Sequence, residues 1–338
     1  MNRGGLQVAP VSAENAERIA EFVYNIFGYS YPDTRLYTPA RLVQELSGFV
    51  CLGPTGKVYG LVIFYFDFPS RRLVEIGGLM VDPLLGESAG GQVLKALMEA
   101  LAPGIKTLTD EHGLRAALNM NVTEHQLAQR LSERMGFVTA GFYLGYIPRH
   151  NYRFRTTPHE RTASRAPVGE ASGGRKSLTI SVRPIRSKTP PHTVCLPDRY
   201  EALAREIYDD FRLAVTYQAA VEPEGPGRVE AKLDFTYAIA NLIVREVGTE
   251  TIEALVKYVE HYRSGFVELI HIFLPLSGAN IDPVVEFFAA RGFTFAAILP
   301  QYVDGPVLVL QSIDRALLAP ISPAAFDPRA ARILACAL

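Results

Sequence analysis

The sequence VEIGGLMVDPLLGESAGGQVLKAL, residues 74–97, changes near its middle from a strand pattern to a glycine-containing loop and a helix pattern. Its first part is an apolar β-strand pattern that stops at Asp82 and Pro83, because proline cannot continue a strand ladder. A loop of glycine and small residues follows, and an amphipathic helix then begins. Such a junction lets backbone N–H groups approach an anion at the positive end of a helix dipole. The stretch therefore predicts a phosphate-binding loop, with an ordinary strand-to-helix turn as the alternative.

The composition describes a globular chain of about two domains. It has 338 residues, of which 48% are hydrophobic and 20% charged, so each half can bury a core. A formal net charge of −1 provides no basic field for nucleic acid or for an anionic membrane surface. We therefore expect neither nucleic acid nor a membrane as partner.

The three cysteines, Cys51, Cys195 and Cys336, are widely separated and form no CxxC pair. We expect no disulfide framework and no metal site, and a reducing cytoplasm fits best. The first residues show no apolar signal-peptide core, and no apolar run reaches the roughly 18 residues of a membrane helix. The apolar end ARILACAL is expected to be a packed tail.

A polar segment, residues 154–177, divides the chain. It is rich in Arg, Ser, Thr, Pro and Gly, which is typical of linkers. Residues 1–153 predict a strand, two helices, three strands, a helix, a strand, a helix and a strand, and residues 178–338 repeat this layout. The local echo between RMGFVTAGF and ARGFTFAAI supports an internal duplication.

The strand, loop and helix of residues 74–97 resemble motif A of the GNAT (Gcn5-related N-acetyltransferase) superfamily. There, a strand ending in V-x-P leads into R/Q-x-x-G-x-G/A and a long helix. The glycine pair of that motif falls on Ala89 and Gly91. Its Arg or Gln falls on Gly86, a departure that removes one side chain from the pyrophosphate site.

The resemblance continues in TEHQLAQRLSERMGF and covers most of residues 6–148 and, more weakly, residues 178–313. The longer pattern looks like a bacterial subfamily of tandem GNAT proteins. It implies an α/β (α+β) fold with two GNAT-like domains, each a mixed, mostly antiparallel sheet flanked by helices. The second domain is expected to have lost its coenzyme A cradle, because NLIVREVGTETIEAL contains a single glycine, Gly248.

The implied co-substrate is acetyl-coenzyme A or another acyl-coenzyme A, without a metal. The residues expected to contact it are Met80, Val81, Gly86, Glu87, Ser88, Ala89, Gly90, Gly91, Gln92, His125 and Gln129. The N–H of Met80 or Val81 would polarise the thioester. His125 lies where the family often has Asn, and Ser132 lies where it often has the Tyr that protonates the thiolate.

Glu75 is the expected general base, because the resemblance places it at the strand position where histone-acetylating GNAT proteins have a glutamate base. A carboxylate flanked by Val74 and Ile76 on a central strand should also have a raised pKa. The alternative is a structural strand residue. His125 is the second catalytic candidate, as an imidazole that moves protons near pH 7. Its alternative is a residue that caps its own helix or contacts the pantetheine arm.

The segment GYSYPDTRLYTP, residues 28–39, is expected at the acceptor side of the cleft. Its candidate substrate-binding residues are Tyr29, Tyr31, Asp33, Arg35 and Tyr37. An equally weighted alternative is structural. In that case the tyrosines pack the helices onto the sheet, and Asp33 and Arg35 form a surface ion pair worth about 0–1 kcal/mol.

The leading hypothesis is an acyl-coenzyme A-dependent N-acyltransferase acting on a small-molecule amine. The second is a non-catalytic acyl-coenzyme A sensor or scaffold, and a third is an enzyme that takes its acyl group from a carrier protein. The expected assembly is a monomer with pseudo-dimeric domains or a homodimer.

Overall fold

The computed structural model describes residues 5–124, 126–148, 174–185, 190–302, 305–322 and 326–338. It divides into two compact units. Unit 1 contains the described residues of Met1–Asp67 and Val74–Leu114, and unit 2 contains those of Phe68–Leu73, Arg115–Arg149 and Gly173–Leu338. None of the described helices combines the length and the apolar composition needed to cross a membrane.

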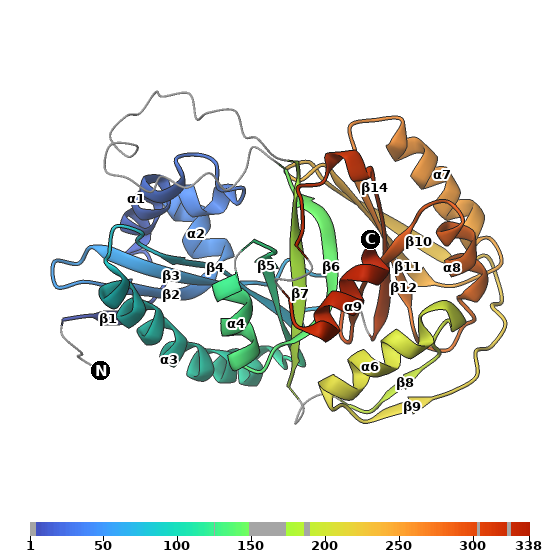
Figure 1. Cartoon of the computed structure of the whole chain (residues 1–338). Helices are drawn as coiled ribbons and strands as arrows, with labels where there is room; N and C mark the ends of the chain where they lie inside the picture. The colour runs from blue at the N-terminus through green and yellow to red at the C-terminus, as the bar shows by residue number, and fades with distance from the viewer. Residues whose placement is uncertain (1–4, 125, 149–173, 186–189, 303–304, 323–325) are drawn as a thin grey trace. The chain divides into compact units, whose positions relative to one another are not determined.

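Unit 1 is an antiparallel sheet with helices on both faces (Figure 1). Its strand order is β1 (Gln7–Pro10), β2 (Ser47–Leu52), β3 (Val58–Tyr65) and β4 (Leu73–Val81). One face carries α1 (Ala16–Phe27), the 3-10 helix η1 (Thr34–Tyr37) and α2 (Pro39–Glu45). The other face carries the long helix α3 (Glu87–His112).

The core of unit 1 follows from the helical spacing of apolar residues in α1. Ile19, Val23 and Ile26 recur on one face and are fully or almost fully buried. They belong to one apolar cluster with Ile63 and Tyr65 of β3. The side chain of Tyr65 therefore lies on the sheet face that α1 covers.

The sequence patterns PARLVQELSG and GGQVLKALMEALAPG predict helices that end at Gly48 and Gly104, and both ends differ in the structure. The predicted end of α3 at Gly104 is wrong, because the helix continues through Pro103 to His112. A Cβ on Gly104 would lie 2.5 Å from the Phe49 ring, so the helix approaches β2 closely at this point. Gly48, predicted to end α2, lies in β2 instead.

Unit 2 is a larger mixed sheet. Its strand order is β5 (Ala116–Val122), β7 (Lys176–Pro184), β6 (Val138–Ile147), β13 (Thr294–Leu299), β14 (Val307–Ile313), β12 (Leu269–Pro275), β11 (Ile239–Glu246) and β10 (Arg228–Asp234). The pair β11–β12 is parallel, and the neighbouring pairs are antiparallel. Its helices include α4 (Gln126–Arg134), α6 (Glu201–Phe211), α7 (Thr251–Arg263), α8 (Asp282–Ala289) and α9 (Pro328–Ala337). The α/β class with a mixed sheet is confirmed.

The same strand insertion occurs twice in this sheet. β7 lies between β5 and β6, and β14 lies between β12 and β13. The strand predicted to open the second half therefore pairs with two strands of the first half. The domain boundaries stated above remain predictions.

Two smaller predictions concern other parts of unit 2. The sequence AVTYQAAV predicts a strand, which in the structure is the short β9 (Val215–Tyr217), paired with β8 (His192–Val194). The expected packed tail is the helix α9, which buries Ala330, Ile333, Leu334 and Ala337.

Candidate functional site

The N-terminus of α3 is open to an incoming group. Gly86 precedes the helix, no side chain caps it, and its carbonyl accepts the N–H of Gly90 at 2.9 Å. Among the described residues, the N–H groups of Gly86 to Ala89 have no acceptor, as expected for a first helical turn. Of the residues that the structure describes, none would lie within 4 Å of a Cβ on Gly86 or Gly91. These donors fit an anion such as the pyrophosphate of coenzyme A.

The acid before this loop does not occupy the open donors. Asp82 is buried, and its Oδ1 accepts the N–H of Leu84 at 2.9 Å. Its Oδ2 lies 3.6 Å from Lys57 Nζ. The carboxylate therefore shapes the turn after β4 and leaves the end of α3 accessible.

The matching junction in unit 2 has a different environment. The N–H of Thr249 donates to the Gly225 carbonyl at 2.7 Å, and that of Glu250 donates to the Pro226 carbonyl at 3.3 Å. The N–H of Gly248 donates to Thr251 Oγ1 at 2.8 Å. A turn of the same chain thus takes up the donors at the start of α7.

A bulge interrupts β4 between the open helix end and Glu75. Leu61 of β3 pairs with Met80 and Ile63 pairs with Gly77, so β4 has one extra residue in this interval. Gly78 has φ +56°, a left-handed conformation that glycine adopts without strain. Met80 pairs with Leu61 and Val81 with Gly60, so the bulge lies just before both. Their role toward the thioester stays a prediction.

Glu75 lies opposite Tyr65 in the β3–β4 register and is half-buried. Residues opposite each other in an antiparallel pair project to the same face, here the face of α1. A Cβ on Gly77 would lie 2.8 Å from Glu75 Oε1 and 2.9 Å from Tyr65 Cε2. Glycine at position 77 therefore leaves the room that the carboxyl group and the phenol ring occupy.

The pKa of Glu75 is raised to about 8. Burial is the main cause, the negative charges of Asp67 and Asp33 add to it, and Arg35 opposes it. No hydrogen bond or ion pair of the Glu75 carboxyl group is seen in the described part of the chain. A carboxyl group in this state can exchange a proton near neutral pH.

Arg35 joins two acids beside Glu75. Its Nε lies 2.9 Å from Asp33 Oδ1, and its Nη1 and Nη2 donate to the two oxygens of Asp67 at 3.0 and 2.6 Å. The guanidinium carbon lies 5.4 Å from the centre of the Tyr65 ring. With two carboxylates and one guanidinium, this cluster has a formal charge of −1 before Glu75 is counted.

The three candidate tyrosines lie in three different environments. Tyr31 is 7% exposed and packs against Phe27 in the core. The Tyr37 hydroxyl accepts the backbone N–H of Tyr31 at 3.1 Å, so it holds the loop in place. Tyr29 is 80% exposed and its ring contacts those of Tyr24 and Tyr37.

The remaining candidates belong to unit 2 or lie outside the described residues. His125 is outside them. The Gln129 amide donates to the carbonyls of Val122 and Thr123 and so caps the end of β5. The Ser132 hydroxyl is buried in a polar network with Asn119 and Asn121, at 3.1 and 2.9 Å.

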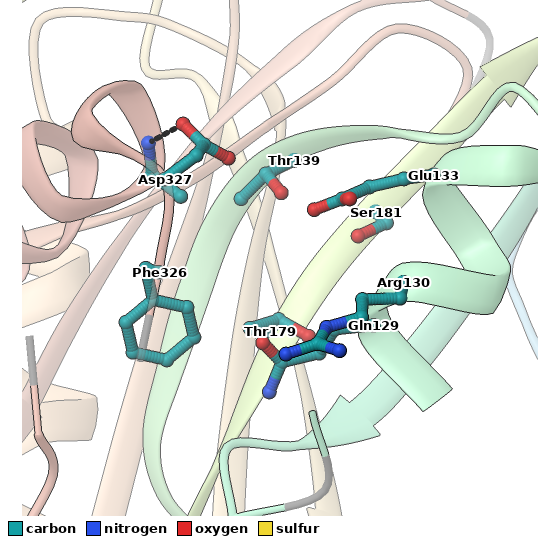
Figure 2. A pocket seen from close by; sticks show the side chains of 9 residues that line it. Gln129, Arg130, Glu133, Thr139, Thr179, Ser181, Phe326 and Asp327 are labelled. Carbon is teal, nitrogen blue, oxygen red and sulfur yellow. Dashed lines mark hydrogen bonds between the residues drawn. The ribbon is translucent and has the colours of Figure 1, made fainter. Parts of the chain in front are cut away.

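A polar pocket of unit 2 lies beside α4 and the start of α9 (Figure 2). Its lining residues are Gln129, Arg130, Glu133, Thr139, Thr179, Ser181, Phe326, Asp327 and Ala330. Asp327 Oδ1 accepts the N–H groups of Arg329 and Ala330, so this acid is occupied as the cap of α9. Within the described residues, no group of three or more His, Cys, Asp or Glu side chains is placed to hold a metal ion.

Sequence reasoning missed two members of the unit 1 cluster, Asp67 and Tyr65. Tyr65 could have been found from strand alternation, because the hairpin register places it opposite Glu75. Asp67 carried no comparable signal, since its bond to Arg35 joins positions 32 residues apart.

No family model matches the sequence, and neither does any curated protein. About half of the structure is similar to solved acetyltransferases. The ribosomal-protein-S5-alanine acetyltransferase from Vibrio fischeri has 13% identity and a TM-score of 0.38, over 56% of this chain and 98% of that one. The ribosomal-protein-S18-alanine N-acetyltransferase from Escherichia coli has 16% identity and a TM-score of 0.37, over 53% and 94%.

A GCN5-related N-acetyltransferase from Kribbella flavida is also similar, with 19% identity and a TM-score of 0.34, over 54% of this chain and 98% of that one. Structural similarity at these identities and TM-scores does not assign an activity to this chain.

Proposed function

We propose that this chain is an acyl-coenzyme A-dependent N-acyltransferase that acts on a small amine. The observation that carries the proposal is Glu75, a half-buried carboxyl group with a pKa of about 8. It lies on β4, whose end leads into the open N-terminus of α3. A proton acceptor and an anion-binding helix end on one strand–loop–helix unit suit acyl transfer from a phosphorylated donor.

The first turn of α3 would hold the pyrophosphate of the donor. The N–H groups of Gly86 to Ala89 supply the donors, and Gly90, Gly91 and Gln92 continue the same turn. The bound thioester would supply the activated acyl group. The backbone around the bulge, including Met80 and Val81, would direct N–H groups toward its carbonyl oxygen.

Glu75 would act as general base. At pH 7 a carboxyl group with a pKa of about 8 is mostly protonated, but a bound ammonium ion favours its charged form. Glu75 then accepts the proton that the ammonium ion loses. The neutral nitrogen bonds to the acyl carbon, the carbon–sulfur bond breaks, and the sulfur leaves as a thiolate. The acylated nitrogen then loses its second proton, which neutralises the departing thiolate to the free thiol.

The acceptor would bind beside η1. Asp33 and Asp67 give the cluster its negative charge, while Arg35 fixes both carboxylates by hydrogen bonds. This charge favours a cationic amine over an acid. The exposed ring of Tyr29 would provide apolar contact at the edge, and Tyr31 and Tyr37 would hold the loop that carries these groups.

The direct test incubates the protein with acetyl-coenzyme A and a panel of small amines and measures the release of free thiol. We expect amine-dependent release that rises with pH through about 8, following the ionisation of Glu75. Calorimetry with coenzyme A tests the binding step separately. Absence of coenzyme A binding would refute the proposal.

The second candidate is an acyl-coenzyme A sensor or scaffold. It is favoured by the missing side chain at Gly86 and by Ser132, whose hydroxyl is committed to a buried network. This function predicts binding without turnover. An active protein whose turnover depends on Glu75 would exclude it.

The proposal includes the two-domain organisation, with residues 1–153 catalytic and residues 178–338 without coenzyme A binding. It also includes a cytoplasmic location. The turn at Gly225 and Pro226 supports the loss of binding in the second domain, because it takes up the donors at the start of α7.

A further inference from the structure

The outer edge of β10 has no strand partner among the described residues. β10 is the last strand of its sheet and pairs with β11 on its inner side alone. In unit 1 the equivalent strand, β3, is flanked by β2 and then β1. In the part of the chain that the structure describes, no such strands lie next to β10. An unpaired strand edge exposes N–H and C=O groups that can bind another strand.

The side chains of β10 alternate strictly along its sequence, RVEAKLD. One face carries charges in the order Arg228 (+), Glu230 (−), Lys232 (+), Asp234 (−). The other face carries Val229, Ala231 and Leu233. Arg228 and Lys232 are exposed, and Leu233 is 36% exposed.

This order of charges is self-complementary in a single antiparallel register. If two copies of β10 pair with Ala231 opposite Ala231, Arg228 lies opposite Asp234 and Glu230 lies opposite Lys232. Val229 then lies opposite Leu233 on the other face. Opposite charges at facing positions stabilise a strand pair, and like charges destabilise it.

Shifting the register by two residues reverses the effect. A shift in one direction places Arg228 opposite Lys232 of the other copy and Glu230 opposite Glu230 of the other copy. A shift in the other direction places Lys232 opposite Lys232 and Glu230 opposite Asp234. A shift by one residue places charged side chains opposite apolar ones. The sequence therefore selects one alignment among the alternatives.

The end of the same strand carries exposed aromatic surface. Phe235, directly after β10, is 73% exposed and stacks on Phe266, which is 53% exposed, with ring centres 5.3 Å apart. Charged side chains on an edge strand oppose unspecific pairing. The exposed Phe235–Phe266 pair adds apolar surface at the end of this charged edge, which favours a specific partner.

The geometry points to a homodimer in which the β10 edges of two copies pair antiparallel about a twofold axis at Ala231. The partner is a second copy of this chain, and the two sheets continue into each other through the pair. This inference is independent of the proposed enzymatic function. An interface of this size is small, so the dimer should dissociate at low micromolar concentration.

The first test measures the oligomeric state by sedimentation velocity across protein concentration and at two salt concentrations. We expect a monomer–dimer equilibrium that shifts toward monomer at high salt, because ion pairs are screened. A chain that stays monomeric at all concentrations up to about 100 µM would overturn the proposal.

Charge reversals test the register. Lys232→Glu places Glu against Glu230 of the other copy at two symmetric positions, and Glu230→Lys places Lys against Lys232. Each variant alone should dimerise at least about tenfold more weakly. An equimolar mixture should form a heterodimer, since all facing charges are then opposite. Lys106→Glu on α3 is the control and should dimerise like the unmodified chain.

The outcome that overturns the register is a dimer unaffected by Lys232→Glu, or two weakened variants that do not recombine. Circular dichroism of each variant checks that the fold is retained. Glu230 contacts Arg245 at 2.9 Å within the chain, so Lys232→Glu is the primary variant.

Cysteine crosslinking gives an independent measurement in a Cys336→Ser background, which removes the exposed thiol. Ala231→Cys should form an intermolecular disulfide under mild oxidation, because the axis places position 231 opposite itself. Val229→Cys and Leu233→Cys should crosslink efficiently only when mixed. Equal crosslinking of all three variants alone would contradict the alignment.

Discussion

The two strand-to-helix junctions of this chain share a topology, and they differ in whether their backbone N–H groups have hydrogen-bond acceptors. Before α3, the N–H groups of Gly86 to Ala89 have no acceptor among the described residues. Before α7, the N–H groups of Thr249 and Glu250 donate to Gly225 and Pro226. An open helix end can bind an anion, whereas an occupied one is part of the fold.

The close packing at the second junction leaves room only for a glycine at position 248. A Cβ on Gly248 would lie 2.1 Å from the backbone nitrogen of Gly227, far inside contact distance. At the first junction, Gly86 and Gly91 face open space. The same residue type thus serves chain packing at one site and access at the other.

The strands that lead into the two junctions also differ at their third residue. β4 carries Glu75, whose pKa burial raises to about 8. β11 carries the neutral Asn241, whose Oδ1 lies 3.2 Å from Nδ1 of the buried His271. Burial lowers the pKa of His271 to about 3, so its ring is neutral at pH 7. Of these two strand positions, Glu75 titrates near neutrality, whereas the amide of Asn241 does not titrate.

The largest expected effect comes from Glu75→Gln, which would place a neutral amide on β4, as Asn241 does on β11. We expect kcat to fall about 100- to 1000-fold, because the variant cannot accept a proton. Coenzyme A affinity should change little, because Glu75 precedes the open helix end by eleven positions in the chain. Steady-state kinetics and calorimetry measure the two quantities. Glu21→Gln, an exposed change on α1, is the control, and equal turnover in both variants would contradict the role of Glu75.

The same substitution should raise stability at high pH. The pKa of Glu75 is about 8 in the folded chain and about 4.5 in the unfolded chain. Between these values the unfolded state releases the proton while the folded state keeps it, so the free energy of unfolding falls as pH rises. The fall ends near pH 8. We expect Glu75→Gln to be more stable by about 2–3 kcal/mol at pH 8.5, after a reduction for partial solvent exposure.

Urea unfolding at pH 4.5, 6.5 and 8.5 measures this difference. The advantage of the variant should be near zero at pH 4.5 and grow toward pH 8.5. An advantage that is constant with pH would show that packing, and not the proton, causes it.

Much of the fold could be predicted from the sequence because it depends on local periodicity. The helical spacing of apolar residues in AERIAEFVYNIF predicts α1, and the turn GPTGK between two apolar runs predicts β2 and β3. The structure contains all three elements. The end of α3 could not be predicted, because Pro103 and Gly104 usually end helices and the close contact with Phe49 is a tertiary effect.

The candidate site could be predicted in part. Glu75 was predicted from the family resemblance of its strand and from its apolar neighbours, and its raised pKa follows from the burial that such neighbours indicate. The difference in exposure between Tyr29 and Tyr31 could not be predicted from the sequence, because it depends on the turn conformation of the loop. The Arg35–Asp67 pair joins two distant segments, and nothing in either segment indicates the other.

Thr251→Val tests the occupied junction. The buried Thr251 hydroxyl accepts the N–H of Gly248 at 2.8 Å, so the variant leaves a buried donor unpaired. We expect a loss of about 2 kcal/mol in the free energy of unfolding. The matched change at the open junction, Ser88→Ala, should stay within about 0.5 kcal/mol because Ser88 is exposed and caps nothing. Comparable losses in both variants would remove the distinction between the junctions.

Ser88→Asp tests the open junction by adding one negative charge to the first turn of α3. The charge should repel a bound pyrophosphate and weaken coenzyme A binding about tenfold. The helix itself should not be harmed, because an acid at a helix N-terminus is stabilising. Thr249→Asp adds the same charge before α7 and should leave coenzyme A affinity unchanged. If calorimetry found equal weakening by both variants, the difference between the two helix ends would have no bearing on ligand binding, and the open amides of α3 would need another explanation.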